Sequence, residues 1–266
     1  MKSMKEVVAS LRQDLAQPPE LRSNYLAPVF GSIANGYAYL LAGSHGAPLS
    51  ELAARLATRP LGSLPARPPV LVFSLRGEPT ARTLAVLARG GVGGQIENGC
   101  QFADQVATRC KAWHSLHDAA PSAVLIENVG ALDVRLCERH QETWEDEGGE
   151  TFSHESPFGW ACGRSDSLEV RSKRVALTLE GIARFLDCPV LATLYVNRLD
   201  VQKGPVSSLV RQLGDLAEFH DHTMGFAFLS EDGAFAVVSH HRLGPSGMKV
   251  PLAFNPETGE FDEASM

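Results

Sequence analysis

Short apolar runs alternate along the chain with stretches in which apolar residues recur at helical spacing. Each run is too short for a buried helix and continuous enough for a strand that is covered on both faces. Strands that alternate with helices predict an α/β fold, with a mainly parallel twisted sheet flanked by helices. The runs are 37-YAYLLA-42, 70-VLVFSL-75, 123-AVLIEN-128 and 189-PVLATLYVN-197, and the helical stretches are 50–59, 79–90, 101–116 and 171–186.

The two ends of the chain differ from this alternating centre. Residues 4–16 show an amphipathic helical pattern that stops at Pro18, because proline cannot continue the helical hydrogen-bond ladder. We therefore expect an N-terminal helical segment over 1–22 and a single domain over 23–266. Near the other end, the runs 223–230, 234–242 and 249–255 are separated by turn residues, which predicts an antiparallel hairpin and a third strand at the sheet edge.

The composition is that of an ordinary globular protein, with 44% hydrophobic and 21% charged residues among 266. That length is enough for one large α/β domain. No apolar run reaches the roughly 18 residues of a membrane span, and the start has no apolar core of a secretory signal. The five cysteines never occur as CxxC, which argues against a disulfide scaffold or a zinc ribbon. We expect a cytoplasmic protein with no membrane partner.

Negative charge is concentrated in one segment of the chain. The formal net charge is −7, and residues 133–155 carry eight acids against two arginines. No strong basic footprint for nucleic acid is visible in the sequence. The acidic segment is compatible with a solvated loop or with a loop that repels nucleic acid, so DNA as a partner stays open.

The loop 43-GSHGAPLS-50 lies between the first strand and a helix, where α/β proteins bind phosphate groups. A phosphate-binding loop needs G-x-x-x-x-G-K-[ST], whose lysine neutralises phosphate and whose hydroxyl holds Mg²⁺. Gly43, Gly46 and the hydroxyl of Ser50 remain. Pro48 replaces the second signature glycine and has no N–H to donate, and Leu49 replaces the lysine.

At this point the chain resembles a known family, the RecA-fold ATPase domain of DnaB-type hexameric replicative DNA helicases. The resemblance covers roughly residues 25–262 and implies a RecA-like, P-loop NTPase-type fold. It rests on the order and wording of six segments, 37–57, 70–88, 124–132, 171–198, 207–230 and 240–261.

The resemblance implies that several positions of the chemistry have been replaced. Leu49 stands where the family has its phosphate-loop lysine, and Arg76 stands where it has the glutamate that activates water. Glu127 stands for the aspartate on the Mg²⁺ side, and Tyr195 for a glutamine that senses the γ-phosphate. Phosphoryl transfer depends on electrostatic stabilisation, so these losses together predict a degenerate catalytic site with no competent catalytic residue.

Two further positions bear on a neighbouring subunit. The resemblance implies that His240 replaces a lysine, and that Arg242 matches the arginine finger given to a neighbour's nucleotide. ATP with Mg²⁺ is the expected cofactor only if the vestigial nucleotide site still binds it. That site would comprise Gly43, Gly46, Ser50, Glu127 and Arg242.

Several of these residues also have simpler interpretations. Ser50 is expected to do no more than cap its helix, and Arg242 can be part of a hairpin corner. His220, His222 and His240 are weak candidates for a metal site, since imidazole suits Zn, Ni or Cu. Alternation along a strand would place His240 and His241 on opposite faces, so at most one of these two joins such a cluster, and no metal is expected.

The sequence thus favours a catalytically degenerate DnaB-helicase-like protein that interacts or regulates in DNA replication, recombination or mobile-element maintenance. Its expected partners are its own copies or a helicase or other replication protein. Two alternatives stay open. One is an active ATP-dependent DNA helicase or translocase with an atypical nucleotide site, and the other is a metal-dependent enzyme on the same scaffold.

Overall fold

The computed structural model describes residues 27–30, 33–58, 68–75, 81–133, 143–145, 151–153, 167–197, 201, 206–242 and 246–262. The expected N-terminal helical segment, residues 1–22, lies outside these ranges, as do Arg76 and Pro79. The division of the chain at residues 22 and 23 therefore stays a prediction.

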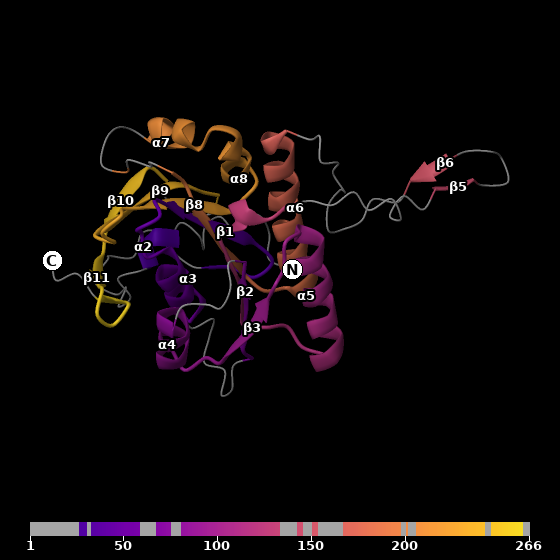
Figure 1. Cartoon of the computed structure of the whole chain (residues 1–266), viewed down its shortest axis with the longest axis horizontal. Helices are drawn as coiled ribbons and strands as arrows, with labels where there is room; N and C mark the ends of the chain where they lie inside the picture. Colours follow the sequence, from indigo (N-terminus) through magenta and orange to yellow (C-terminus); the bar gives the residue numbers. More distant parts are fainter. Residues whose placement is uncertain are drawn as a thin grey trace, which may run out of the picture.

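One eight-stranded sheet organises the chain (Figure 1) in the order β10-β9-β8-β1-β7-β4-β2-β3. Strands β3, β2, β4, β7, β1 and β8 run parallel to their neighbours, and β9 and β10 continue the sheet antiparallel. The strands are β1 (Ala38–Gly43), β2 (Val70–Ser74), β3 (Gly94–Asn98), β4 (Ala123–Glu127), β7 (Val190–Tyr195), β8 (Gly225–Leu229), β9 (Phe235–His241) and β10 (Met248–Pro251).

Helices cover both faces of this sheet, with α3 and α4 on one side and α5 and α6 on the other (Figure 1). Successive strand residues point to opposite faces, so Leu40 joins the apolar core on the α5–α6 side and Leu41 the core on the α3–α4 side. The helices are α2 (Ala27–Phe30), α3 (Leu49–Ala57), α4 (Ala81–Arg89), α5 (Ala103–His117), α6 (Leu168–Leu186), α7 (Val206–Leu213) and α8 (Ala217–Asp221), with short 3₁₀ turns η2 (Val129–Ala131) and η3 (Gly214–Leu216).

The predicted α/β alternation is confirmed. The four apolar runs form β1, β2, β4 and β7, and the four helical stretches form α3, α4, α5 and α6. Strand β3 was not predicted, because the segment 94–98 has a single large apolar residue and lies at the exposed edge of the sheet. Helices α7 and α8 were also missed.

The predicted antiparallel edge is confirmed in β8, β9 and β10, although β8 also pairs in parallel with the central strand β1. The third predicted strand, 249–255, is divided. Its first part belongs to β10, and the rest forms β11 (Ala253–Asn255), which pairs with β12 (Glu260–Asp262) in a separate small sheet. In the acidic segment, β5 (Thr143–Glu145) and β6 (Thr151–Ser153) form a short antiparallel hairpin.

The described cysteines are residues of the protein core. Cys100, Cys110 and Cys188 are buried and unpaired with one another. Burial raises the pKa of Cys188 to about 12, so this thiol acts as an inert core residue. Among the described helices, none is both long and apolar enough to cross a membrane.

Candidate functional site

The loop between β1 and α3 occupies the carboxyl edge of the parallel sheet, where α/β folds bind ligands. Gly43 is the last residue of β1, and it pairs with Tyr195 on β7 and with Leu229 on β8. The loop is thus fixed between two neighbouring strands. His45 at its tip is exposed and stacks on the ring of Tyr195, with ring centroids 5.4 Å apart.

The side chain at the lysine-equivalent position points into the protein. Leu49 is 0% exposed and belongs to the apolar core between the sheet and α3. Its Cδ2 atom lies 3.3 Å from the place that a Cβ on Gly43 would take, so it packs beneath the loop. A lysine in this conformation would place its ammonium in the core instead of over a phosphate.

The backbone N–H groups of the loop are largely used within the loop. The Ala47 N–H donates to the Ser44 carbonyl oxygen at 3.0 Å, and the Leu49 N–H donates to the Ala47 carbonyl oxygen at 2.8 Å. Pro48 between them has no N–H. Three consecutive positions therefore offer no free donor to a phosphate, whose binding at such loops depends on those donors.

An acidic side chain lies against the outside of the same loop. A Cβ on Gly46 would lie 3.0 Å from Oε1 and Cγ of Glu231, which follows β8 in the chain. Glu231 and Gly46 are both exposed. Its carboxylate would repel a phosphate group brought to this loop.

Glu127, at the end of β4, lies among hydroxyl groups. Burial is the largest influence on its carboxyl and raises its pKa. Hydrogen bonds from Ser50 and Ser74 oppose that rise, as does the one from Thr83, whose Oγ1 lies 3.5 Å from Oε1 of Glu127. The nearby Glu51 raises the pKa further.

This environment corrects the expectation for Ser50. Helix α3 begins at Leu49 with Pro48 at its N-cap position, and no side chain caps it. The hydroxyl of Ser50 bonds Glu127 instead, because its position one residue inside the helix turns it toward the end of β4. Ser50 and Glu127 therefore do meet, as a vestigial Mg²⁺ site would require.

Replacing Glu127 by glutamine is expected to raise the free energy of unfolding by on the order of 1 kcal/mol at pH 7. The amide removes a partly buried charge, and its oxygen still accepts from Ser50. Because the pKa of Glu127 is raised on folding, its contribution to wild-type stability is fully present below the ordinary glutamate pKa of about 4.3 and is lost as the pH rises. Urea unfolding at several pH values should show that the free energy of unfolding of the variant exceeds that of the wild type by more as the pH rises above 4. A gap that narrows with rising pH would contradict this assignment.

Arg242 lies at the opposite end of the strands from the loop. It follows β9, whose His241 is level with Gly225 and hence with Tyr39 at the start of β1. The length of β1 therefore separates Arg242 from Gly43, and within one chain the predicted nucleotide-site residues do not all come together. Arg242 is exposed, and its Nη2 donates to the Asp221 carbonyl oxygen at 3.0 Å.

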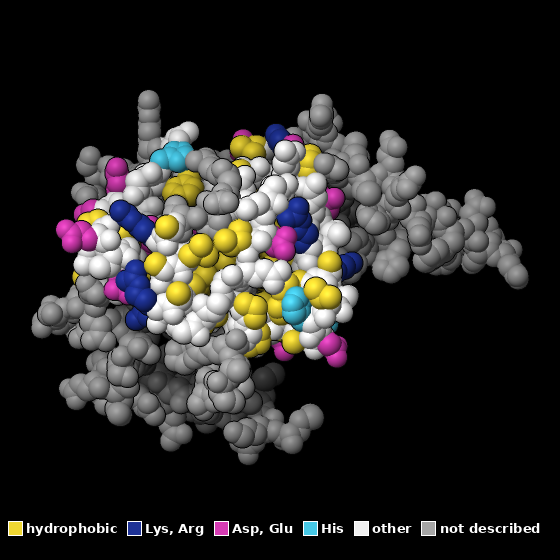
Figure 2. All heavy atoms as spheres, turned by 60° about the horizontal axis from the view of Figure 1, so that its bottom comes forward, with side chains coloured by type: hydrophobic (Ala, Val, Ile, Leu, Met, Phe, Trp, Pro, Cys, Tyr) yellow, Lys and Arg dark blue, Asp and Glu magenta, His cyan; other side chains and the backbone are white. Residues whose placement is uncertain are grey.

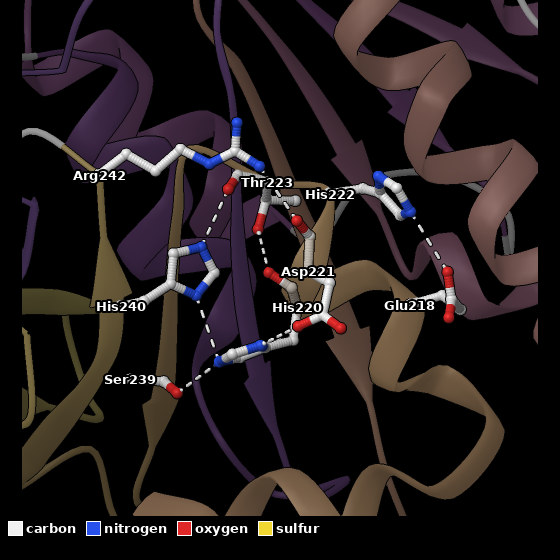
Figure 3. A network of polar contacts seen from close by, with 8 residues as sticks. All are labelled: Glu218, His220, Asp221, His222, Thr223, Ser239, His240 and Arg242. Atoms are coloured by element: carbon white, nitrogen blue, oxygen red, sulfur yellow. Dashed lines mark hydrogen bonds and ion pairs between the residues drawn. The ribbon is translucent and has the colours of Figure 1, made fainter.

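The histidine candidates are only partly brought together (Figure 3). His220 Nε2 lies 3.2 Å from His240 Nδ1, whereas His222 turns away and contacts Glu218 at 3.2 Å. His241 lies on the other face of the sheet beside Tyr39, as strand alternation predicts. Burial is the main influence that lowers the pKa of His240, which favours its neutral form.

His241 is a buried imidazole that makes no hydrogen bond to any other described residue. It is 8% exposed, neither ring nitrogen has a partner among the described residues, and its ring centroid lies 6.0 Å from that of Tyr39 and 6.2 Å from that of Phe30. Replacing His241 by phenylalanine is expected to raise the free energy of unfolding by about 1–2 kcal/mol, because it removes unpaired polar atoms from an aromatic cluster.

Stability should also depend on pH through His241, because burial lowers its pKa. Below the ordinary histidine pKa of about 6.5, the unfolded chain takes up a proton that the folded chain resists, so wild-type stability falls as the pH falls. Thermal unfolding between pH 7.5 and 5 should show a shallower loss for H241F. A variant less stable than wild type at every pH would show that this imidazole has a hidden partner.

Sequence reasoning missed Ser74, Thr83 and Glu231. Ser74 ends a parallel strand, which is a signal that could have placed it at the site. Glu231 follows the run 223–230, but that run was predicted to be antiparallel, and its parallel pairing with β1 places Glu231 beside the loop. Thr83 reaches the site only through tertiary packing, and no local pattern marks it. Arg76 lies outside the described residues, so its predicted place beside the site stays a prediction.

Several solved structures resemble this arrangement of strands and helices. The chain matches a solved structure described as an ATPase domain with a TM-score of 0.62 and 14% identity, over 100% of both chains. It matches a DnaB-like replicative helicase, described with its interactions with primase, with a TM-score of 0.60 and 14% identity, over 98% of this chain and 67% of that one. It matches the RadB recombinase with a TM-score of 0.55 and 14% identity, over 91% and 97%.

These likenesses show the RecA-like fold, of the kind found in DnaB-like helicase ATPase domains, and so confirm the predicted fold class. No protein-family model matches the sequence, and no curated protein matches it.

Proposed function

We propose that this RecA-fold chain is a catalytically inactive interaction or regulatory protein of DNA replication, recombination or mobile-element maintenance. The observation that carries the proposal is the buried side chain of Leu49, which packs under the loop where a cation would have to face a phosphate. Loop N–H groups that bond within the loop and the adjacent Glu231 carboxylate act in the same direction. Together they oppose binding of a nucleoside triphosphate.

The alternative of an active helicase predicts a measurable activity. We expect no phosphate release from ATP above background, with or without single-stranded DNA. An activity that DNA stimulates and that Glu127→Ala abolishes would establish the helicase alternative, because contaminating ATPases would not respond to that substitution. Any such activity retained by the variant would count as contamination.

Surface charge favours a protein partner over nucleic acid. Affinity for DNA comes largely from Lys and Arg contacts with phosphates. On the face drawn in Figure 2, the described Lys and Arg side chains lie apart from one another, and hydrophobic side chains gather between them. The acidic segment 133–155 would add repulsion wherever it approached DNA.

We infer that copies of the chain associate through opposite ends of the strands, one beside the loop and the other beside Arg242. Glu231 is exposed beside the loop at one end, and Arg242 is exposed at the other. A head-to-tail arrangement would place the Arg242 guanidinium of one copy against the Glu231 carboxylate of the next. The carboxylate would then take the place that a nucleotide phosphate has in a competent ATPase assembly, and association would need no nucleotide.

Charge reversal tests this contact directly. Glu231→Arg and Arg242→Glu should each weaken self-association, measured by light scattering over a concentration series, and the double variant should restore it. The matched control is Glu257→Arg, which reverses an exposed acid in the turn between β11 and β12. If the chain is monomeric at every concentration, the same variants are tested for binding to a DnaB-type helicase. A double variant no better than the single ones in both assays would contradict the inferred contact.

A further inference from the structure

A β-bulge brings two polar side chains of β9 to the same side of the sheet. Phe226 of β8 pairs with His240, but the next residue, Ala227, pairs with Val238, so Ser239 is the extra residue of the bulge. In a regular strand Ser239 and His240 would point to opposite faces. Here both contact His220 at the end of α8, as Figure 3 shows. Bulges often redirect side chains in this way next to functional sites.

The outer ring nitrogen of each histidine is committed as a hydrogen-bond donor. His220 Nδ1 lies 2.8 Å from the carboxylate oxygen Oδ1 of Asp221, and His240 Nε2 lies 2.9 Å from the carbonyl oxygen of Thr223. A carboxylate or carbonyl oxygen only accepts, so both outer nitrogens carry their protons. In the neutral imidazoles, the inner nitrogens then present lone pairs.

Those two inner nitrogens face a common space. His220 Nε2 and His240 Nδ1 are 3.2 Å apart, and the ring planes are inclined at 75°. The Ser239 hydroxyl, 2.7 Å from His220 Nε2, can donate its single proton to one of these lone pairs but not to both. At least one lone pair is therefore left that a shared cation could take.

We propose that His220 Nε2 and His240 Nδ1 bind a divalent transition-metal ion of the Zn²⁺ class. Two Zn–N bonds of tetrahedral geometry hold their nitrogens roughly 3.3–3.4 Å apart, close to the spacing found here. Imidazole is a preferred ligand for this class of ion. The hydrogen bonds from the outer nitrogens to a carboxylate and a backbone carbonyl are those that orient metal-binding histidines.

The remaining coordination positions fall to water, because the Ser239 hydroxyl, 2.7 Å from His220 Nε2, is at hydrogen-bond distance and too close to be a second ligand of the same ion. Within the described part of the chain, no three His, Cys, Asp or Glu side chains converge, so the proposed site has two imidazole ligands and is not a closed structural zinc site. Solvent can reach it, because the side chain of His220 is 18% exposed and that of Asp221 is 69% exposed. His222, paired with Glu218, takes no part.

The bound ion would join α8 to β9 next to Arg242, which is itself bonded to the backbone of Asp221. The site is independent of nucleotide chemistry and stands whether or not the proposed function is correct. The bound ion would hold the end of α8 against the end of β9, next to Arg242.

Zinc titration of the untagged, chelator-treated full chain tests the proposal. At Zn²⁺ about 100-fold above its dissociation constant, we expect the melting temperature to rise by about 5 °C or more. His240→Gln and His220→Gln should each weaken Zn²⁺ binding at least tenfold in calorimetric titration, and Asp221→Asn should weaken it roughly 10- to 100-fold by freeing the His220 ring. His222→Gln is the matched control and should bind as wild type does.

A second measurement does not depend on any variant folding. Co²⁺ bound by the wild-type chain should give visible absorption that an equivalent of Zn²⁺ removes. An unchanged melting temperature with Zn²⁺ would mean that the two nitrogens share a proton, and the proposal would be wrong. Equal binding by wild type and a folded H240Q, or loss of binding in H222Q, would also overturn it.

Discussion

Replacing Leu49 by lysine is expected to lower the free energy of unfolding by about 3 kcal/mol and to create no ATP binding. In a competent phosphate loop this change would restore the cationic anchor. Here the side chain is 0% exposed and packs in the core beneath Gly43, so an ammonium would have to be buried or the loop displaced.

Leu49→Met is the matched control, because it keeps side-chain volume and apolar character and should cost less than about 1.5 kcal/mol. Urea unfolding of both variants gives the two values, and a fluorescent ATP analogue reports binding. A lysine variant as stable as wild type, or one that binds the analogue with Mg²⁺, would show that the loop is open and lacks only its charge.

Replacing Gly233 by alanine is the second substitution with a large expected effect, a loss of about 3 kcal/mol of unfolding free energy from backbone strain and overpacking together. Gly233 has φ of +71°, which costs an L-residue roughly 1–2 kcal/mol. An added Cβ would also lie 2.7 Å from Cβ of Phe254 and 3.0 Å from Cγ of Pro48. The turn after β8 packs here against Phe254 of β11 and against Pro48 of the loop. The added methyl group would push these contacts apart.

Gly247 separates the two contributions. It has φ of +72° and no atom of the described residues within 4 Å of an added Cβ, so Gly247→Ala should show the backbone cost alone, about 1 kcal/mol. Thermal or urea unfolding of both variants measures the difference. Equal losses for the two would mean that the turn does not press on Pro48 and Phe254.

The fold could be predicted from the sequence because its central elements carry strong local patterns. Runs such as 70–75 and 123–128 are apolar at nearly every position, which only a strand covered on both faces explains. Strand β3 could not be found this way, since at an exposed edge the burial that produces a pattern is missing. The third tail strand was misjudged because a continuous apolar pattern does not reveal that the chain changes sheets between Pro251 and Ala253.

The sequence could predict only those site residues that lie at or just after the ends of strands. Gly43, Ser50 and Glu127 lie together because parallel strands end at one edge, and the sequence shows those ends. The inward turn of Leu49 and the approach of Glu231 depend on packing between segments far apart in the chain. The contact between His220 and His240 likewise depends on a bulge, which leaves no mark in the alternation of β9.

Thermal unfolding in the presence of ATP and Mg²⁺ tests most directly whether this loop has lost the ability to bind a nucleotide. A ligand that binds the native state must stabilise it, by about 2.7 kcal/mol at 100 times its dissociation constant. We predict the same melting temperature with millimolar ATP and Mg²⁺ as with Mg²⁺ alone. A rise of several degrees that depends on the triphosphate and is lost in Glu127→Ala would contradict the proposal of an inactive ATPase fold.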